Sequence, residues 1–221
     1  HSTDADAILP ADYFSITTAL DSTKTSAAVY PFRHTPHADE NVQQAQTLYD
    51  LCMDYYVAGL KWAGSSWAYH TIGSTLLINA EHYAQVRGFP KRQAGEDFYL
   101  LNKLAKIGSI VTLNSTPIAL ASRLSDRVPF GTGPALNKII AMESPLEEFL
   151  FYHPQCFVYL KSWLAFVRTL QAGKNIALST DIIEQFVLAN EEYTDVDSQL
   201  LMKCLESLVT SKALDLAFSH S

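Results

Sequence analysis

Three scarcities in this sequence of 221 residues exclude whole classes of protein. Cysteine occurs three times, at the widely separated positions Cys52, Cys156 and Cys204. An odd, scattered set makes neither a disulfide framework nor a zinc ribbon, and is typical of packed thiols in a reducing compartment. Positive charge is also scarce, since 16 Lys and Arg against 23 Asp and Glu give a net charge of -7. We therefore expect no nucleic-acid partner, because phosphate binding depends on basic side chains.

Long hydrophobic runs are missing as well. The most apolar window, Phe149 to Val167, is interrupted by His153, Pro154 and Lys161, whereas a membrane-spanning helix needs about 20 nearly continuous apolar residues. We expect a buried or surface-seeking helix there, with membrane contact as the minor alternative. The first residues show neither the basic region nor the apolar segment of a secretory signal. The expected location is the cytoplasm, with peripheral attachment to the inner face of the membrane as the alternative.

The residues that are present predict a folded chain of mixed structure. Hydrophobic residues make up 48% of the sequence and charged residues 18%, which disfavours a disordered or fibrous chain. Short apolar segments predict strands over 26–32, 73–79, 110–113 and 118–121. Apolar residues at helical spacing predict a short helix within 8–20 and longer ones over 41–60, 80–86 and 96–107. The fold class is therefore predicted to be α/β.

After about residue 135 the sequence pattern predicts helices and no further strands. Ser144-Pro145-Leu146-Glu147 has the residue order of a helix start. Asp181 with Glu184 resembles another, and apolar spacing predicts a last helix over 200–209. We expect an α/β portion over 1–135 and a helical portion over 136–221.

Two carboxylates close to the beginning of the chain, Asp4 and Asp6, are separated by one small residue. Both can reach one hard divalent cation, and their oxygens suit Mg²⁺ or Mn²⁺, which usually bind substrate phosphates too. Asp-x-Asp is a short pattern that arises often by chance, so a solvated loop is the alternative interpretation.

A second acidic pair, Glu96 and Asp97, follows Gly95 and opens a predicted helix. The helix dipole favours a carboxylate in a first turn, so simple capping is one interpretation. The functional interpretation is a general base that takes a proton from an acceptor hydroxyl.

The segment 122–133 is dense in arginine, small hydroxyl residues and glycine. Arginine forks bind phosphate bidentately, and glycine lets the backbone approach a ligand closely. Arg123 and Arg127 are therefore candidate phosphate ligands. The alternative is a surface loop in which Asp126 pairs with an arginine.

Histidines and aromatic residues in the region 34–70 allow two interpretations. His34 and His37 could supply a metal or acceptor contact, although two loop histidines are more often surface groups. An aromatic stretch before Gly73 could be a platform for sugars or bases, or could pack in the core; it comprises Trp62, Trp67, Tyr69 and His70.

Taken in order, four motifs resemble a known family. They are Asp4-Ala5-Asp6, Gly73-Ser74-Thr75-Leu76-Leu77-Ile78-Asn79, Val86-Arg87-Gly88-Phe89-Pro90 and Gly95-Glu96-Asp97-Phe98-Tyr99-Leu100. This order resembles the second half of a family 2 glycosyltransferase with the GT-A fold, over about residues 1–135. Gly-Phe-Pro followed by Gly-Glu-Asp is its most specific part.

The resemblance implies an inverting transfer of one sugar from a nucleotide-sugar donor to an acceptor that the sequence does not identify. Asp4 and Asp6 would hold a divalent metal, Mn²⁺ or Mg²⁺, that bridges the donor diphosphate. Asp97 would be the base, with Glu96 beside it. Other residues would line the floor of the site or close over the diphosphate: Gly73, Ser74 and Thr75 in the first role, Arg123 and Arg127 in the second.

The sequence departs from the family pattern in two ways. The Gln-x-x-Arg-Trp motif of processive members does not occur, which favours single-sugar transfer over polymerisation. Nothing before Asp4 corresponds to the strands that grip the nucleobase, so we expect a partial GT-A fold that is inactive unless another chain supplies them. The alternatives are a non-catalytic module that forms a homodimer through an open sheet edge or the helices, and another metal-dependent phosphate enzyme that uses Asp4 and Asp6.

Overall fold

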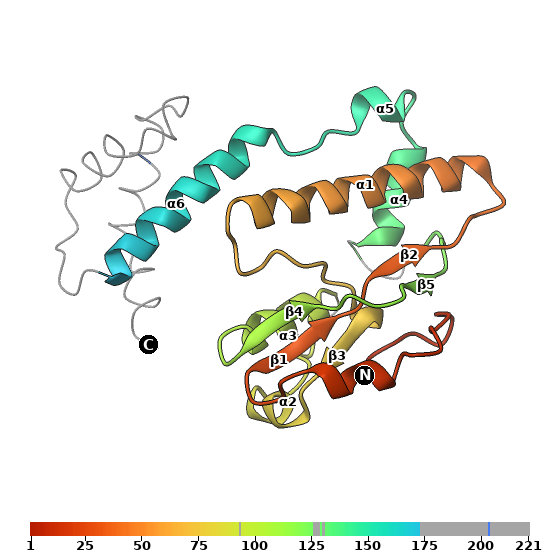
Figure 1. The fold of residues 1–221 in the computed structure, drawn as a ribbon. Coiled ribbons are helices and arrows are strands. Elements are labelled where there is room, and N and C mark those ends of the chain that lie inside the picture. The colour runs from red at the N-terminus through yellow and green to blue at the C-terminus, as the bar shows by residue number, and fades with distance from the viewer. Residues whose placement is uncertain (93, 126–128, 130, 173–202, 204–221) are drawn as a thin grey trace. The chain divides into compact units, whose positions relative to one another are not determined.

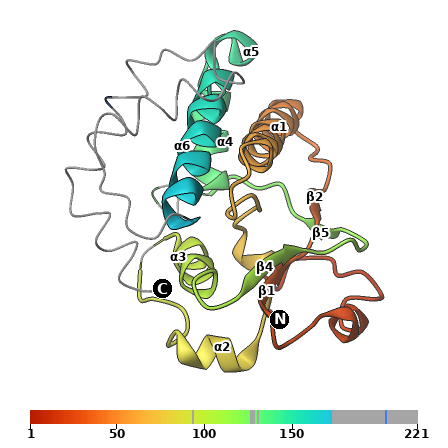
Figure 2. The ribbon, with the colours of Figure 1, turned by 60° about the vertical axis from the view of Figure 1, so that its left-hand side comes forward.

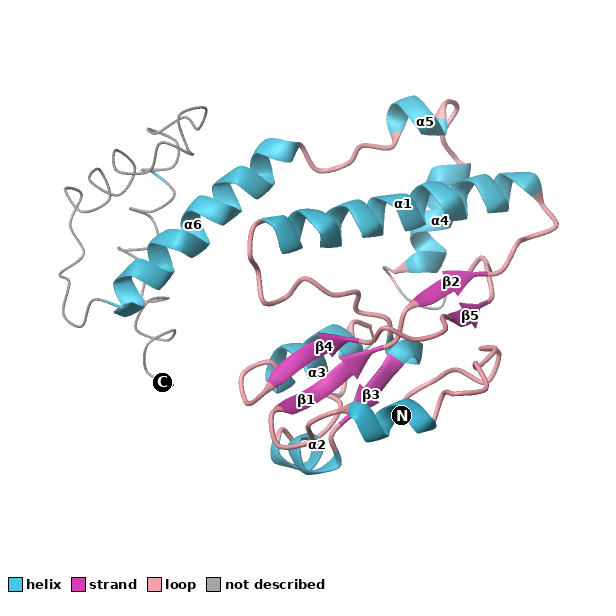
Figure 3. Ribbon diagram, in the orientation of Figure 1, coloured by secondary structure: helices cyan, strands magenta, loops and turns pink. Residues whose placement is uncertain are grey.

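The computed structural model describes residues 1–92, 94–125, 129, 131–172 and 203. The chain divides into two compact units. Unit 1 comprises His1–Val57 and Tyr69–Phe151, and unit 2 comprises Ala58–Ala68 and Tyr152–Ser221. The described residues form helices and two small sheets (Figures 1 and 3), which confirms the predicted α/β class at this general level.

A three-stranded mixed sheet lies at the centre of unit 1. Strand β1 (Thr25–Val29) pairs in parallel with β4 (Ser109–Thr112) and antiparallel with β3 (Leu76–Ile78). The register places Ala28 opposite Leu77 on one side and Val111 on the other. A second sheet joins β2 (Phe32–His34) and β5 (Ile118–Leu120) in parallel.

Two of the predicted strands differ from the observed ones. The predicted strand 26–32 is interrupted after Val29, because Pro31 has no N–H with which to continue a ladder. The chain resumes as β2 in the other sheet. The predicted strand 73–79 begins instead with a 3₁₀ turn, η2 (Gly73–Thr75), before β3.

The two faces of β1 are buried by different elements, as the alternation of side chains along a strand requires. Ala27 and Val29 pack with the leucines of α3 (Glu96–Leu104) in one core cluster. Ala28 packs with Tyr13 and Tyr30 in another, beside the 3₁₀ turn η1 (Ser15–Ala19). Figure 2 shows α3 and the N-terminal segment on opposite sides of the sheet.

Short helix α2 (Ala80–Gln85) connects β3 to the segment before α3. The Asn79 side chain caps it by accepting hydrogen bonds from the N–H groups of Glu81 at 2.9 Å and His82 at 3.2 Å. The helix ends at Val86, and Gly88 beyond it has φ +65°, a conformation that glycine adopts without strain.

Helix α1 (Glu40–Trp62) begins in unit 1 and ends in unit 2. In unit 1, its Ala45 packs against Leu136 and Ile139 of α4 (Thr132–Ile140). The predicted boundary at residue 135 lies inside α4, and the predicted helix start at Ser144 is confirmed by α5 (Pro145–Glu148).

Unit 2 contains the end of α1 and helix α6 (Pro154–Ala172). The Phe157 ring covers Gly59 so closely that a Cβ there would overlap it, and Lys161 Nζ lies 4.6 Å from the centroid of the Trp62 ring. Helix α6 accounts for most of the apolar window 149–167, although residues 149–153 precede it. The predicted helices near 181 and over 200–209 lie outside the described residues.

None of the helices among the described residues has both the length and the apolar sequence that crossing a membrane requires. Cys52 and Cys156 are free thiols, and Cys204 lies outside the described residues.

Candidate functional site

The segment that carries Asp4 and Asp6 is fixed at both ends by the two sheets. Ser2 forms an antiparallel bridge to β3, and Ile8 forms one to β5. Between them the Ala7 N–H donates to the Asp4 carbonyl oxygen at 3.2 Å, closing a tight turn. The two carboxylates therefore project from a short turn that is pinned at both ends, not from a loose terminus.

A chain of contacts leads from this turn to the second acidic pair. The Ser2 hydroxyl donates to the carbonyl oxygen of Gly73 at 2.8 Å. Gly73 in turn lies against Asp97: a Cβ at position 73 would stand 3.5 Å from Asp97 Oδ2. The 3₁₀ turn η2 thus connects the Asp4–Asp6 turn with the start of α3.

The start of α3 holds Asp97 half-buried and Glu96 exposed. Gly95 precedes them with φ +70°, which lets the chain turn sharply into the helix. The Phe98 N–H donates to Asp97 Oδ1 at 2.7 Å. Burial raises the pKa of Asp97; the hydrogen bond from Phe98 opposes this, and the neighbouring charge of Glu96 adds to the rise. A carboxylate with a raised pKa is a stronger base than an ordinary aspartate.

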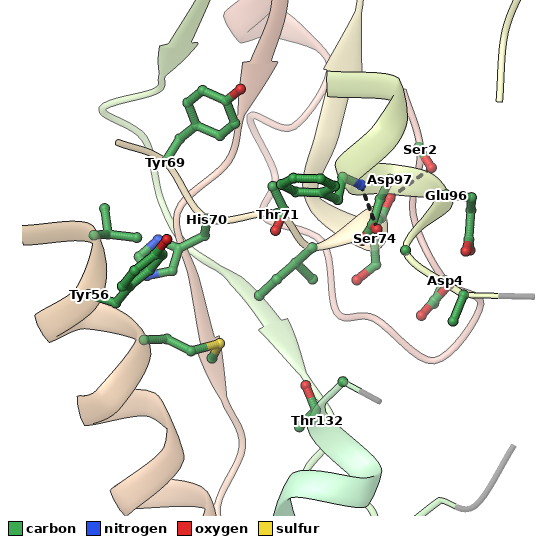
Figure 4. Close-up of a pocket in the computed structure, with 18 of the residues that line it drawn as sticks. Ser2, Asp4, Tyr56, Tyr69, His70, Thr71, Ser74, Glu96, Asp97 and Thr132 are labelled. Atoms are coloured by element: carbon green, nitrogen blue, oxygen red, sulfur yellow. Dashed lines mark hydrogen bonds between the residues drawn. The ribbon is translucent and has the colours of Figure 1, made fainter. Parts of the chain in front are cut away.

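The larger of two neighbouring cavities in unit 1, of about 690 Å³, contains most of the predicted site residues (Figure 4). Five of them line it: Asp4, Gly73, Ser74, Glu96 and Asp97. They come from the N-terminal turn, from η2 and from the start of α3, so the fold brings together three segments that are distant in the sequence.

The smaller cavity, of about 180 Å³, is lined by Asp4, Asp6, Ser74 and Arg123 among others. Arg123 Nη1 lies 2.6 Å from Asp6 Oδ2, so a predicted phosphate ligand pairs with a predicted metal ligand. Because Asp4, Ile72, Ser74 and Thr132 line both cavities, the two adjoin at these residues.

The acidic pair on the N-terminal turn suits a magnesium or manganese site that water and substrate phosphates complete. Within the described ranges, no three His, Cys, Asp or Glu side chains gather as a complete protein-made metal site. Mg²⁺, however, is commonly held by one or two carboxylates with waters and substrate phosphates completing its shell. Asp4 and Asp6, both exposed and both lining the smaller cavity, supply two such carboxylates.

Two predicted residues are not placed at the cavities. Thr75 is fully buried, and its hydroxyl donates to the Ile72 carbonyl oxygen at 2.9 Å. It lines neither cavity. Arg127 lies outside the described residues.

The structure also shows polar contacts on α1 that the sequence did not reveal. His34 Nδ1 lies 3.0 Å from Asp50 Oδ2, and His70 Nε2 lies 3.1 Å from Asp54 Oδ1. His37, by contrast, accepts a hydrogen bond from the N–H of the nearby Asp39 at 3.0 Å in a local turn. Asp50 and Asp54 are four residues apart and so share one helix face, which was the available signal that two histidines could find partners there.

Comparisons of the chain with protein-family models, with curated proteins and with solved structures find no match. We therefore infer the function from the chemistry and geometry of the two adjoining cavities.

Proposed function

We propose that this chain carries the metal, diphosphate and base side of a glycosyltransferase that transfers one sugar, with inversion, from a nucleotide-sugar to an acceptor. One observation carries the proposal: Asp4 and Ser74 line both cavities, so the Asp4–Asp6 turn and Asp97 border two adjoining cavities. The motif order that resembles family 2 glycosyltransferases supports the same assignment.

In this proposal the smaller cavity receives the donor diphosphate. Asp4 and Asp6 hold Mg²⁺ or Mn²⁺ with their carboxylate oxygens. A divalent cation there would neutralise charge on the departing nucleoside diphosphate. Arg123 borders the same cavity, and its guanidinium fork suits diphosphate oxygens.

The larger cavity receives the acceptor. Asp97 takes the proton of the attacking hydroxyl while the hydroxyl oxygen forms the new bond to the anomeric carbon. Attack from the side opposite the diphosphate breaks the bond to the leaving group and inverts the configuration. The raised pKa of Asp97, caused chiefly by burial, suits this role.

A titration of the full chain with Mn²⁺, followed by the loss of the free-ion electron paramagnetic resonance signal, tests the proposal. It is run alone and with UDP, GDP or inorganic pyrophosphate. Each diphosphate is also titrated with Mn²⁺ without the protein, because it chelates the ion in solution and this contribution has to be subtracted. We expect a diphosphate to tighten Mn²⁺ binding by about tenfold or more, because its oxygens complete the metal shell. A hydrolase with a complete protein-made metal site would bind Mn²⁺ equally tightly without a diphosphate.

The matched variants are Asp6→Asn, in the smaller cavity, and Asp39→Asn, whose amide oxygen replaces the carboxylate oxygen that accepts from the Asn41 N–H at the start of α1. D6N should abolish the effect of the diphosphate and D39N should preserve it. Equal Mn²⁺ affinity with and without every diphosphate, or an effect that survives D6N, would refute the proposal.

A further inference from the structure

The side of the larger cavity formed by α1 and the segment after it is mainly aromatic and apolar. Tyr49, Met53 and Tyr56 occur at spacings of four and three residues, which places them on one face of α1. Tyr69 and His70 continue this wall. Figure 4 shows Tyr56 and His70 on one side of the cavity and the acidic residues of α3 on the other.

The charge of the cavity limits what it can bind. Asp4, Glu96 and Asp97 line it, and no Lys or Arg is among its described lining residues. In the metal-free chain, a ligand that carries a phosphate or carboxylate of its own would meet three carboxylates without a compensating cation. Like charges at short range repel strongly in a partly buried site. The cavity therefore favours a ligand without negative charge.

His70 adds a polar group to the aromatic wall. Its Nε2 lies 3.1 Å from Asp54 Oδ1, and its ring packs edge-on against Phe32 with centroids 5.2 Å apart. Nε2 makes no hydrogen bond at this distance, but the negative charge of Asp54 beside it favours the tautomer that carries its proton on Nε2 and leaves a lone pair on Nδ1. Burial lowers the pKa of His70, although Asp54 and Asp50 oppose this, so the neutral ring is favoured. A neutral ring of this kind accepts a hydrogen bond from a hydroxyl.

We propose that the larger cavity binds a neutral saccharide, with an apolar face of the sugar ring against the α1 aromatic wall and a hydroxyl donating to His70. A sugar ring offers both an apolar face and a hydroxyl edge, and the cavity of about 690 Å³ lies within the usual range for small-ligand sites, about 300–1,000 Å³. The assignment of this saccharide as the acceptor rests on the proposed function.

Saturation-transfer NMR and calorimetry on the full chain test the inference. The probes are the neutral methyl glycosides of glucose, galactose, mannose and N-acetylglucosamine, with methyl glucuronide as the anionic counterpart of the glucoside. We expect at least one neutral glycoside to bind, and the glucuronide to bind about tenfold or more weakly than the glucoside, because its carboxylate faces three others.

Two substitutions at His70 separate recognition from folding. His70→Leu removes the hydrogen-bond acceptor and should weaken the binding of the neutral glycoside by about tenfold. This corresponds to the loss of one hydrogen bond of roughly 1.4 kcal/mol. His70→Gln keeps an acceptor oxygen and should retain more of the affinity, which a purely structural role would not produce. Thermal unfolding of both variants establishes that they fold.

Three results would overturn the inference: no neutral glycoside of the panel binds, the glucuronide binds as tightly as the glucoside, or a folded His70→Leu protein binds sugars unchanged. Its failure is distinct from that of the proposed function. Diphosphate-dependent Mn²⁺ binding without sugar binding rejects the saccharide site alone. Sugar binding that depends on His70, without diphosphate-dependent Mn²⁺ binding, supports the saccharide site and rejects the transferase.

Discussion

Arg123 Nη1 lies 2.6 Å from Asp6 Oδ2, so the guanidinium occupies the side of the carboxylate that a cation would also use. The two side chains are 56% and 42% exposed. An ion pair this open to water stabilises the fold by little, about 0–1 kcal/mol. The pair therefore matters more for binding than for folding: Arg123 and a metal ion compete for Asp6, and a diphosphate offers Arg123 another partner.

Substitution of Arg123 by Gln separates these two effects. R123Q should bind Mn²⁺ alone about two- to fivefold more tightly, because the competing ion pair of up to about 1 kcal/mol is gone. It should bind the Mn²⁺ complex of UDP or GDP about tenfold more weakly, because a charged hydrogen bond to phosphate is lost. Calorimetry of R123Q beside Arg33→Gln, an exposed arginine on β2, checks this. Equal changes in both variants would point to net charge instead.

Substitution of Asp97 by Asn should stabilise the chain at neutral pH. Because burial raises the pKa of folded Asp97, the folded chain holds this proton more tightly than the unfolded chain does. The ionised carboxylate thus costs stability above its folded pKa, and this cost disappears below its unfolded pKa of about 3.9. D97N should unfold at a higher temperature than the wild type at pH 7–8, with the difference vanishing towards pH 4 and below.

Glu96→Gln is the matched control for that measurement, since Glu96 is exposed in the same helical turn. Scanning calorimetry from pH 3.5 to about pH 8 on D97N, E96Q and the wild type gives the comparison. A D97N protein that is less stable than the wild type at pH 8 would show that the Asp97 carboxylate is stabilised where it lies, contrary to the role of a base.

Much of the fold could be predicted because it depends on local patterns. The helical spacing of apolar residues located α1 and α3 to within a few residues, and short apolar segments located β4 and β5. The division between β1 and β2 was harder to predict. Pro31 indicated where a strand ends, but it did not indicate that the chain continues in another sheet. Sheet membership depends on partners far away in the sequence.

The candidate site was predictable by residue type but not by contact. Asp4, Asp6 and Asp97 were recognisable as carboxylates in motifs, and two of them meet at the larger cavity. The bridges that pin the N-terminal turn through Ser2 and Ile8 are long-range backbone pairings that leave no local pattern. For the same reason, the sequence could not identify His70 as the partner of Asp54, and the structure was needed to show this contact.

Substitution of Gly73 by Ala should perturb Asp97 without unfolding the chain. The added methyl would stand 3.5 Å from Asp97 Oδ2 and 3.6 Å from its Cβ, which is ordinary van der Waals contact. It would displace water from the carboxyl group and so raise the pKa of Asp97 further. A carbon-13 NMR titration of the aspartate carboxyls checks the direction. A pKa that is lower in G73A than in the wild type would contradict the contact.

The core behind α3 determines where Asp97 lies and can be tested by itself. Leu104 on α3 is fully buried, so Leu104→Ala should cost about 2–5 kcal/mol of unfolding free energy. Leu146 is 87% exposed, and Leu146→Ala should change stability by about 0.5 kcal/mol or less. Urea unfolding of both variants measures the difference, and similar costs would contradict the packing of α3 on β1.

The most direct test of the account asks whether a metal held by Asp4 and Asp6 lies close to Asp97. Bound Mn²⁺ broadens the NMR signals of nearby nuclei, so the backbone amides of Ser74 and Asp97 report on its position when Mn²⁺ and GDP or UDP are added to the full chain. The account predicts that both signals broaden in the wild type and stay sharp in a D4N/D6N double variant. Broadening that persists in the double variant, or that leaves Ser74 and Asp97 sharp in the wild type, would contradict it.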